Sequence, residues 1–104
     1  MNKGNQNKHI PSSHSYKKED KKSILYGDLD VATELINKYH GTGEFRFSKD
    51  NKWTNKEFVE VDCDIGEVYD EETDAFVPTN RFAIHYGKHG THIVPVRRVK
   101  HEAI

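Results

Sequence analysis

The sequence predicts an α+β fold in which an N-terminal loop and one or two short helices pack on an antiparallel sheet. Three observations predict this class. One stretch has the 3.6-residue period of an amphipathic helix, short runs of β-like composition follow it, and turn residues separate these runs. The chain has 104 residues, which is enough for one domain and one small core.

The first part of the chain lacks any period. Residues 1–7 are polar and offer nothing to bury, so we expect a disordered tail there and a single domain over residues 8–104. Residues 9–22 combine Pro11, several serines and a run of charged residues, which predicts a long surface loop. Long ordered loops often carry function, although a solvated connector is the commoner case.

The clearest helix lies between residues 28 and 41. Asp28 or Asp30 can cap its N-terminus, and Gly41 can end it. Its apolar face comprises Val31, Leu35, Ile36 and Tyr39.

Short runs of β-like residues follow the helix. They cover residues 44–47, 57–61, 65–69, 75–77, 81–86 and 91–96. Residues 70–74 and 87–90 have the composition of hairpin turns. In the run 81–86, alternation places Phe82, Ile84 and Tyr86 on one face, and in the run 91–96 either face can be the buried one.

Composition and charge narrow the class of protein. Hydrophobic residues make up 34% of the chain and charged residues 32%, so the core must be small and the surface well solvated. The formal net charge of -1 divides into +4 for residues 1–26, -9 for residues 27–80 and +4 for residues 81–104. The fold can therefore present a basic face built from its two ends and an acidic face built from its middle, which leaves nucleic-acid binding open.

Some classes of protein are excluded. Cys63 is the only cysteine, so neither an internal disulfide nor a paired-cysteine zinc or redox motif can form. No apolar run approaches the ~20 residues of a membrane span, and the first residues lack the apolar stretch of a conventional signal peptide. We therefore expect a soluble chain with no membrane partner.

Seven histidines are many for this length, and four lie in the last fifth of the chain: His85, His89, His92 and His101. The spacing of His85, His89 and His92 is compatible with metal ligands, although a predicted turn interrupts it. Histidines that merely cover the sheet or face solvent are the default. The third interpretation is general acid-base catalysis on RNA, because a histidine titrates near ~6.5 and offers both of its forms at neutral pH. His9 and His92, in the two basic ends, are the candidates.

The acidic run over residues 60–74 holds eight carboxylates. It does not match a calcium-binding EF-hand loop, because Gly66 comes one position early. We interpret the run as a solvated face or as a docking surface for a basic partner. Trp53, the only tryptophan, can stack on a nucleobase, but beside a small core it is more often a packing residue.

Five phrases give the chain a family resemblance. They are NKHI at 7–10, KSIL at 22–25, NKYHGTG at 37–43, IGEVYDEETD at 65–74 and IHYGKHGTHIVP at 84–95. With these phrases the sequence resembles the polymorphic toxin type 50 domain family, whose members also occur at the ends of phage head proteins. The resemblance implies a curved antiparallel sheet of about four strands, similar to barnase, EndoU, colicin and RelE. It also implies ribonuclease chemistry without a metal or cofactor, and a dedicated immunity protein.

The resemblance carries a set of site residues over to this chain: Lys8, His9, His85, Tyr86, Lys88, Thr91 and His92. Within this set we expect His9 and His92 to act as the acid-base pair. We expect Lys8 and Lys88 to balance phosphate charge, and Thr91 to donate its hydroxyl to a phosphate oxygen.

Four further contacts to the substrate are expected from Arg81, His85, Tyr86 and Arg97. The alternation of Tyr86 with Phe82 and Ile84 also fits a core position. The glycines of the GTG phrase at 41–43 are interpreted as a helix stop.

The leading hypothesis is therefore a small, metal-independent ribonuclease of toxin type that cleaves RNA, such as tRNA, by attack of a ribose 2′-hydroxyl. It would act in a cytoplasm, after delivery from another cell or as part of a phage or prophage protein. The alternative is a non-catalytic module of such a protein that binds nucleic acid or a protein partner. A metal-binding accessory domain is the third candidate.

Overall fold

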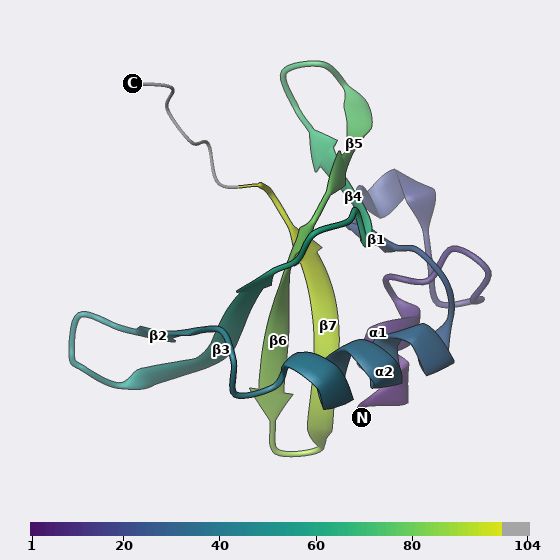
Figure 1. The fold of residues 1–104 in the computed structure, drawn as a ribbon. Coiled ribbons are helices and arrows are strands. Elements are labelled where there is room, and N and C mark those ends of the chain that lie inside the picture. Colours follow the sequence, from purple (N-terminus) through teal and green to yellow (C-terminus); the bar gives the residue numbers. More distant parts are fainter. Residues whose placement is uncertain (99–104) are drawn as a thin grey trace.

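The computed structural model describes residues 1–98, and the end of the predicted domain, residues 99–104, lies outside them. Figure 1 shows two α-helices, α1 (Lys3–Asn7) and α2 (Leu29–Tyr39), and a short 3-10 helix covers Lys18–Asp20. The strands are β1 (Ile24–Leu25), β2 (Glu44–Phe47), β3 (Trp53–Glu60), β4 (Gly66–Asp70), β5 (Ala75–Thr79), β6 (Arg81–Gly87) and β7 (Gly90–Val96). The predicted α+β class is confirmed. Within residues 1–98, no helix combines the length and the apolar character that crossing a membrane requires.

The strands form two antiparallel sheets. The larger sheet has the order β2, β3, β6, β7, and the smaller has the order β1, β4, β5. The hairpins β2–β3 and β4–β5 project away from the centre of the molecule in different directions (Figure 1). The turns predicted over 70–74 and 87–90 join β4 to β5 and β6 to β7. The hairpin β4–β5 of the smaller sheet matches the predicted runs 65–69 and 75–77, whereas β1 is not apparent in the sequence because its two residues show no alternation.

One face of the larger sheet is the main core. Phe82 and Ile84 of β6 are fully buried, as their alternation predicts, and Ile93 of β7 lies opposite Ile84. This register assigns Thr91, Ile93 and Pro95 to the core face, which is the point that the sequence left open. Helix α2 packs against this core with Ala32, Leu35, Ile36 and Tyr39. The opposite face of β6 and β7 is therefore available for a site.

Both ends of α2 follow from local chemistry. Asp28 is the N-cap, since its Oδ1 accepts hydrogen bonds from the backbone N–H of Asp30 at 3.0 Å and of Val31 at 3.3 Å. Gly41, with φ of +82°, ends the helix as predicted. Gly43 has a different role, because a Cβ there would collide with the backbone carbonyl of Phe58. The GTG phrase is therefore both a helix stop and a close contact between α2 and β3.

Strand β3 begins earlier than the sequence predicts. The predicted run starts at residue 57, whereas β3 starts at Trp53 and pairs it with Phe47 of β2. The residues from Trp53 to Lys56 are all exposed, so no buried face imposes alternation on them. Trp53 accordingly lies in a hairpin that projects from the sheet, and not inside the core.

The N-terminal segment differs most from its prediction. The sequence predicts a disordered tail over residues 1–7, whereas the structure has helix α1 there, capped by Asn2. Gln6 is fully buried: its Nε2 donates to the Ile93 carbonyl at 3.0 Å, and its Oε1 accepts from the Ile93 N–H at 2.6 Å. The Asn2 N–H also donates to the Thr91 carbonyl at 2.6 Å. A five-residue helix is not stable by itself, so these bonds to the edge of β7 hold it.

We predict that Gln6→Ala destabilises the fold by about 2–4 kcal/mol, because it leaves a buried N–H and a buried carbonyl of Ile93 without partners. Urea unfolding, followed by circular dichroism, measures the free energy of unfolding. Lys3→Ala changes an exposed position of the same helix and should cost less than about 0.5 kcal/mol. Equal stability of the two variants would contradict the pairing.

Candidate active site

Two histidines meet across neighbouring strands. His85 of β6 lies opposite His92 of β7 in the register, on the face that points away from α2. Their ring centres are 4.8 Å apart, with the planes inclined at 60°. The tight turn between β6 and β7 sets this pairing. It places Gly87 opposite Gly90, and this fixes which residues of the two strands face each other further along, including His85 and His92.

A third histidine reaches the same place from the other end of the chain. His9 comes directly after α1, and its backbone carbonyl accepts a hydrogen bond from the N–H of Leu25 at 2.8 Å. Its ring lies nearly parallel to that of His92, with centres 6.2 Å apart and an angle of 18°. We call His9, His85 and His92 the histidine cluster. The expected convergence of His9 and His92 is therefore present in the geometry.

The hydrogen bonds of His9 define which nitrogen carries its proton. Nδ1 lies 2.9 Å from the carbonyl oxygen of Ser23 and 3.2 Å from the Ser23 hydroxyl. A carbonyl oxygen can only accept, so Nδ1 carries a proton and donates it. The Nε2 of a neutral His9 is then the basic nitrogen. Ser23 has no counterpart in the sequence prediction, because nothing in the sequence indicates that it lies beside His9.

All three rings favour the neutral form. Burial lowers the pKa of His92 to about 4, and the neighbouring His85, His9 and Lys8 act in the same direction. Burial also lowers the pKa of His85, with Lys56 and His9 contributing. Burial also lowers the pKa of His9. The charges of Lys22 and Lys8 lower this pKa further, whereas the hydrogen bond to the Ser23 carbonyl raises it. At neutral pH the cluster therefore consists of uncharged imidazoles that can accept protons.

Two members of the cluster, His85 and His92, border a hollow of about 330 Å³ at the turn end of β6 and β7, and His9 lies beside it through its contact with His92. His85, His92 and Lys88 line it, as does the predicted substrate residue Tyr86. Its other walls include the side chains of Asn2, Asn5, Thr54, Asn55, Lys56 and His89, none of which the sequence analysis assigned to substrate binding. Asn2 and Asn5 were missed because the segment over residues 1–7 was interpreted as a disordered tail.

Lysines supply positive charge beside the cluster. Lys8 is exposed, with its Nζ 3.5 Å from Asn5 Oδ1, and its charge contributes to the low pKa of both His9 and His92. Lys56 of β3 lies opposite His85 in the register. Lys88 projects from the exposed turn. An anion in the hollow would therefore meet cations on several sides.

Two of the predicted site residues are separated from the cluster. Thr91 lies opposite Tyr86 in the register, so it shares the core face and not the face of His92. Arg97 forms an ion pair with Asp70 at 3.7 Å and lines a different hollow near the β4–β5 hairpin. The opposite facing of Thr91 and His92 follows from strand alternation alone, whereas the position of Arg97 depends on how the two sheets meet, which the sequence does not reveal.

Arg81 and Tyr86 are placed less directly. Arg81 shares the outer face with His85 but lies four residues away, about 13 Å along the strand. Its guanidinium stacks over Phe58 at 4.8 Å from the ring centre. Tyr86 lines the hollow, while its hydroxyl donates to the buried carboxylate of Glu57.

Glu57 is a buried carboxylate that the sequence did not single out. It is fully inaccessible to solvent, and it accepts hydrogen bonds from Tyr86 and from the N–H groups of Gly41 at 3.0 Å and Gly43 at 2.7 Å. Burial by itself raises its pKa, but these three bonds outweigh burial and lower it. Burial and the Glu57 carboxylate raise the pKa of Tyr86 to about 12. Glu57 therefore stays charged and holds Tyr86 as a fixed wall of the hollow.

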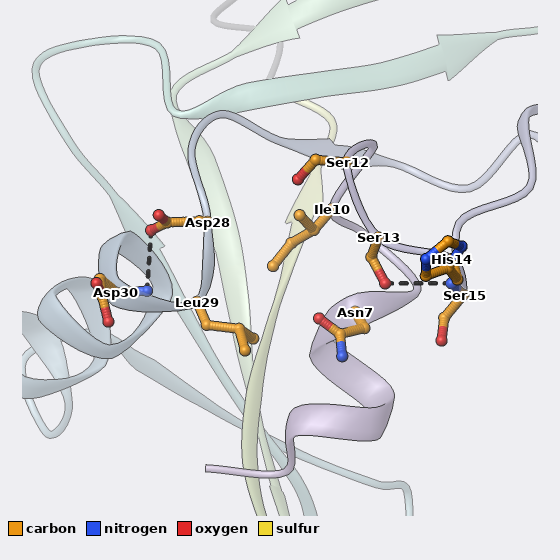
Figure 2. Close-up of a pocket in the computed structure, with 9 residues that line it drawn as sticks. All are labelled: Asn7, Ile10, Ser12, Ser13, His14, Ser15, Asp28, Leu29 and Asp30. Carbon is orange, nitrogen blue, oxygen red and sulfur yellow. Dashed lines mark hydrogen bonds between the residues drawn. The ribbon is translucent and has the colours of Figure 1, made fainter.

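A larger hollow of about 490 Å³ lies elsewhere, between the serine-rich loop and the start of α2 (Figure 2). Asp28 and Asp30 face it, and Asp28 is already engaged in capping the helix. Ser13 accepts a hydrogen bond from the Ser15 N–H within the loop at 3.1 Å. Because its charged walls are acidic, this hollow is a poor site for a phosphate, and the histidine cluster remains the candidate.

Metal ligation was the competing use of the histidines. Within residues 1–98, no group of three or more His, Cys, Asp or Glu side chains is arranged to hold a metal ion. His89 is exposed in the turn, and His101 lies outside the described residues. The spacing of His85, His89 and His92 therefore does not produce a set of converging ligands.

Comparisons with known proteins address the family. A family model described as Bacterial toxin 50 matches residues 1–95 of the chain, which include all three members of the histidine cluster. A search of curated proteins found no match.

The lowered histidine pKa values predict that acid destabilises the fold. Unfolded histidines take up protons near pH 6.5, whereas His92 in the fold does so only near 4, so the unfolded state binds more protons between these values. The free energy of unfolding should therefore be highest above pH 6.5 and fall as the pH drops towards 4. Because His92 is partly exposed, we expect its share of the loss to be about 1–2 kcal/mol.

Urea unfolding between pH 7 and pH 5 measures this slope. His92→Asn should make it shallower, while His14→Asn, at an exposed position outside the cluster, should leave it unchanged. The same slope in His92→Asn and in the wild type would rule out the proposed linkage.

Proposed function

The chain belongs to the bacterial toxin 50 family. From that premise we propose that it is a toxin-type endoribonuclease, in which a ribose 2′-hydroxyl of the RNA attacks the neighbouring phosphate. The observation that carries the proposal is the approach of His9 and His92 to 6.2 Å from opposite ends of the chain. Rings at this distance can both reach one phosphodiester by hydrogen bonds of about 2.8 Å. Cleavage of this kind requires one group that removes a proton and another that supplies one.

His92 is the better general base. Its pKa of about 4 keeps it neutral at physiological pH, so it can accept the proton of a ribose 2′-hydroxyl. The 2′-oxygen then forms a bond to phosphorus, and the bond from phosphorus to the 5′-oxygen breaks. The products are a 2′,3′-cyclic phosphate and a 5′-hydroxyl end.

His9 is the better general acid. The Ser23 carbonyl accepts from its Nδ1–H and opposes the burial that lowers the pKa of His9, and it leaves Nε2 as the nitrogen that can exchange a proton. A bound phosphate adds negative charge beside the ring and raises the pKa further. His9 can then give its Nε2 proton to the departing 5′-oxygen.

Positive charge supports the developing phosphorane. Lys8, Lys56 and Lys88 surround the cluster and can stabilise the extra negative charge of the transition state. Lys56 joins the two lysines that the sequence analysis named. This chemistry uses only side chains of the protein.

The biological setting that we propose follows from the family. A toxin of this kind would act on RNA such as tRNA in the cytoplasm of a target cell, and the cell that makes it would need an immunity protein. The acidic β4–β5 hairpin, with Asp70, Glu71, Glu72 and Asp74, is a second surface that a basic partner could use.

A non-catalytic RNA-binding module is the second candidate. It is favoured by the low pKa of the cluster, because a neutral His9 has no proton to give from Nε2. Binding and cleavage must therefore be measured separately.

We predict that the purified chain cleaves tRNA in the presence of EDTA and leaves 2′,3′-cyclic phosphate ends. His9→Ala and His92→Ala should each reduce the rate at least about 100-fold, because each removes a proton-transfer step. His14→Ala, at an exposed loop histidine outside the cluster, should cleave like the wild type. Thermal melting confirms that each variant is folded.

Two results would contradict parts of this proposal. Intact RNA that is nevertheless bound would favour the binding module. Cleavage that persists in His92→Ala would reject the assigned base.

A further inference from the structure

The β2–β3 hairpin carries an unusual concentration of exposed aromatic side chains. Phe45 is 40% exposed, Phe47 63% and Trp53 39%, whereas the other exposed large hydrophobic residues among residues 1–98, Met1 and Tyr26, lie outside this hairpin. Exposed aromatic groups in one patch on a protein surface often mark a binding site. These three therefore need a functional account.

The three rings enclose a shallow hollow, which we call the aromatic hollow. Phe45 and Trp53 meet edge to face, with ring centres 5.8 Å apart. Together with Phe47 they line an entirely apolar space of about 230 Å³. The indole N–H of Trp53 donates to the Lys56 carbonyl at 3.3 Å, so the ring is held in position while its surface stays accessible.

The aromatic hollow adjoins the histidine site. The Trp53 ring centre lies 5.3 Å from that of Tyr86. Tyr86 also lines the other hollow, the one bordered by His85 and His92. Tyr86 shares the core face, whereas His85 and His92 lie on the other face, so Tyr86 stands between the aromatic hollow and the histidine site at the end of β6. A flexible strand that bends around this end can occupy both.

Charge favours a polyanion as the occupant. Residues 44–56 carry four cationic side chains, Arg46, Lys49, Lys52 and Lys56, against the acidic Glu44 and Asp50. The hairpin is thus a basic region within residues 27–80, although the net charge of those residues as a whole is -9. A protein partner fits less well, because three partly exposed rings are far fewer than the roughly 20 residues a side of a specific interface.

We propose that the aromatic hollow binds an unpaired nucleobase of the same RNA strand whose phosphate lies at the histidine cluster. This inference rests on the proposed ribonuclease function and specifies its substrate as single-stranded RNA. Stacking on aromatic rings accepts every base, and apolar walls offer no hydrogen bonds to distinguish one base from another. The site would therefore hold the strand without selecting a sequence.

The chain offers a direct probe, because Trp53 is its only tryptophan. A 2′-O-methyl oligonucleotide lacks the attacking hydroxyl, so it can bind but cannot be cleaved. We expect it to quench the fluorescence of Trp53, whereas an abasic oligonucleotide of equal length should not. Phe47→Ala should weaken binding of the first oligonucleotide about tenfold and leave binding of the abasic one unchanged.

Tyr26→Ala is the matched control. Tyr26 is 39% exposed, like Trp53, but its hydroxyl donates to Glu67 on another part of the surface. It should bind both oligonucleotides like the wild type. Thermal melting of each variant establishes that it is folded.

Equal quenching by the two oligonucleotides, or unchanged affinity in Phe47→Ala, would overturn the inference. A change of molecular mass in Trp53→Ala, measured by light scattering, would assign the rings instead to contact between copies of the chain and would also overturn it. Base-dependent quenching in a protein that cleaves no RNA would support the nucleobase site and reject the ribonuclease alone.

Discussion

The fold and the candidate site both depend on the pairing of the Gln6 side chain with the backbone of Ile93. An edge strand has free N–H and carbonyl groups, and one amide side chain offers the matching acceptor and donor. The same pairing fixes the site, because His9 follows Gln6 by three residues and His92 precedes Ile93. The distance between the two rings is therefore set by the backbone and a buried side chain, and not by any attraction between the rings.

Helices and strands that bury one face and expose the other could be predicted from the sequence. The α2 helix and the core face of β6 have clear periods, because Phe82, Ile84 and the apolar side of α2 must all point inward. Helix α1 and the first half of β3 have no such period. Gln6 is polar yet buried, and Trp53 is aromatic yet exposed, so hydropathy gives the wrong indication at both positions.

The candidate site was predictable to the extent that it lies in short phrases of sequence. His9, His85 and His92 were named and lie together, and Lys8 and Lys88 lie near them. Thr91 was named from the phrase that contains it, but alternation places Thr91 and its neighbour His92 on opposite faces of β7. Glu57 was missed for another reason: two of its three partners are the backbone N–H groups of Gly41 and Gly43, and the sequence does not show which backbone groups a side chain meets.

The wide sequence separation of His9 from His92 has a consequence for synthesis. His9 leaves the ribosome well before His92, because most of the described sheet lies between them in the sequence. A partly made chain cannot assemble the cluster, so any chemistry that needs both rings is silent during translation. For the ribonuclease proposed above, this separation would delay cleavage of the RNA of the translating ribosome until β7 has emerged.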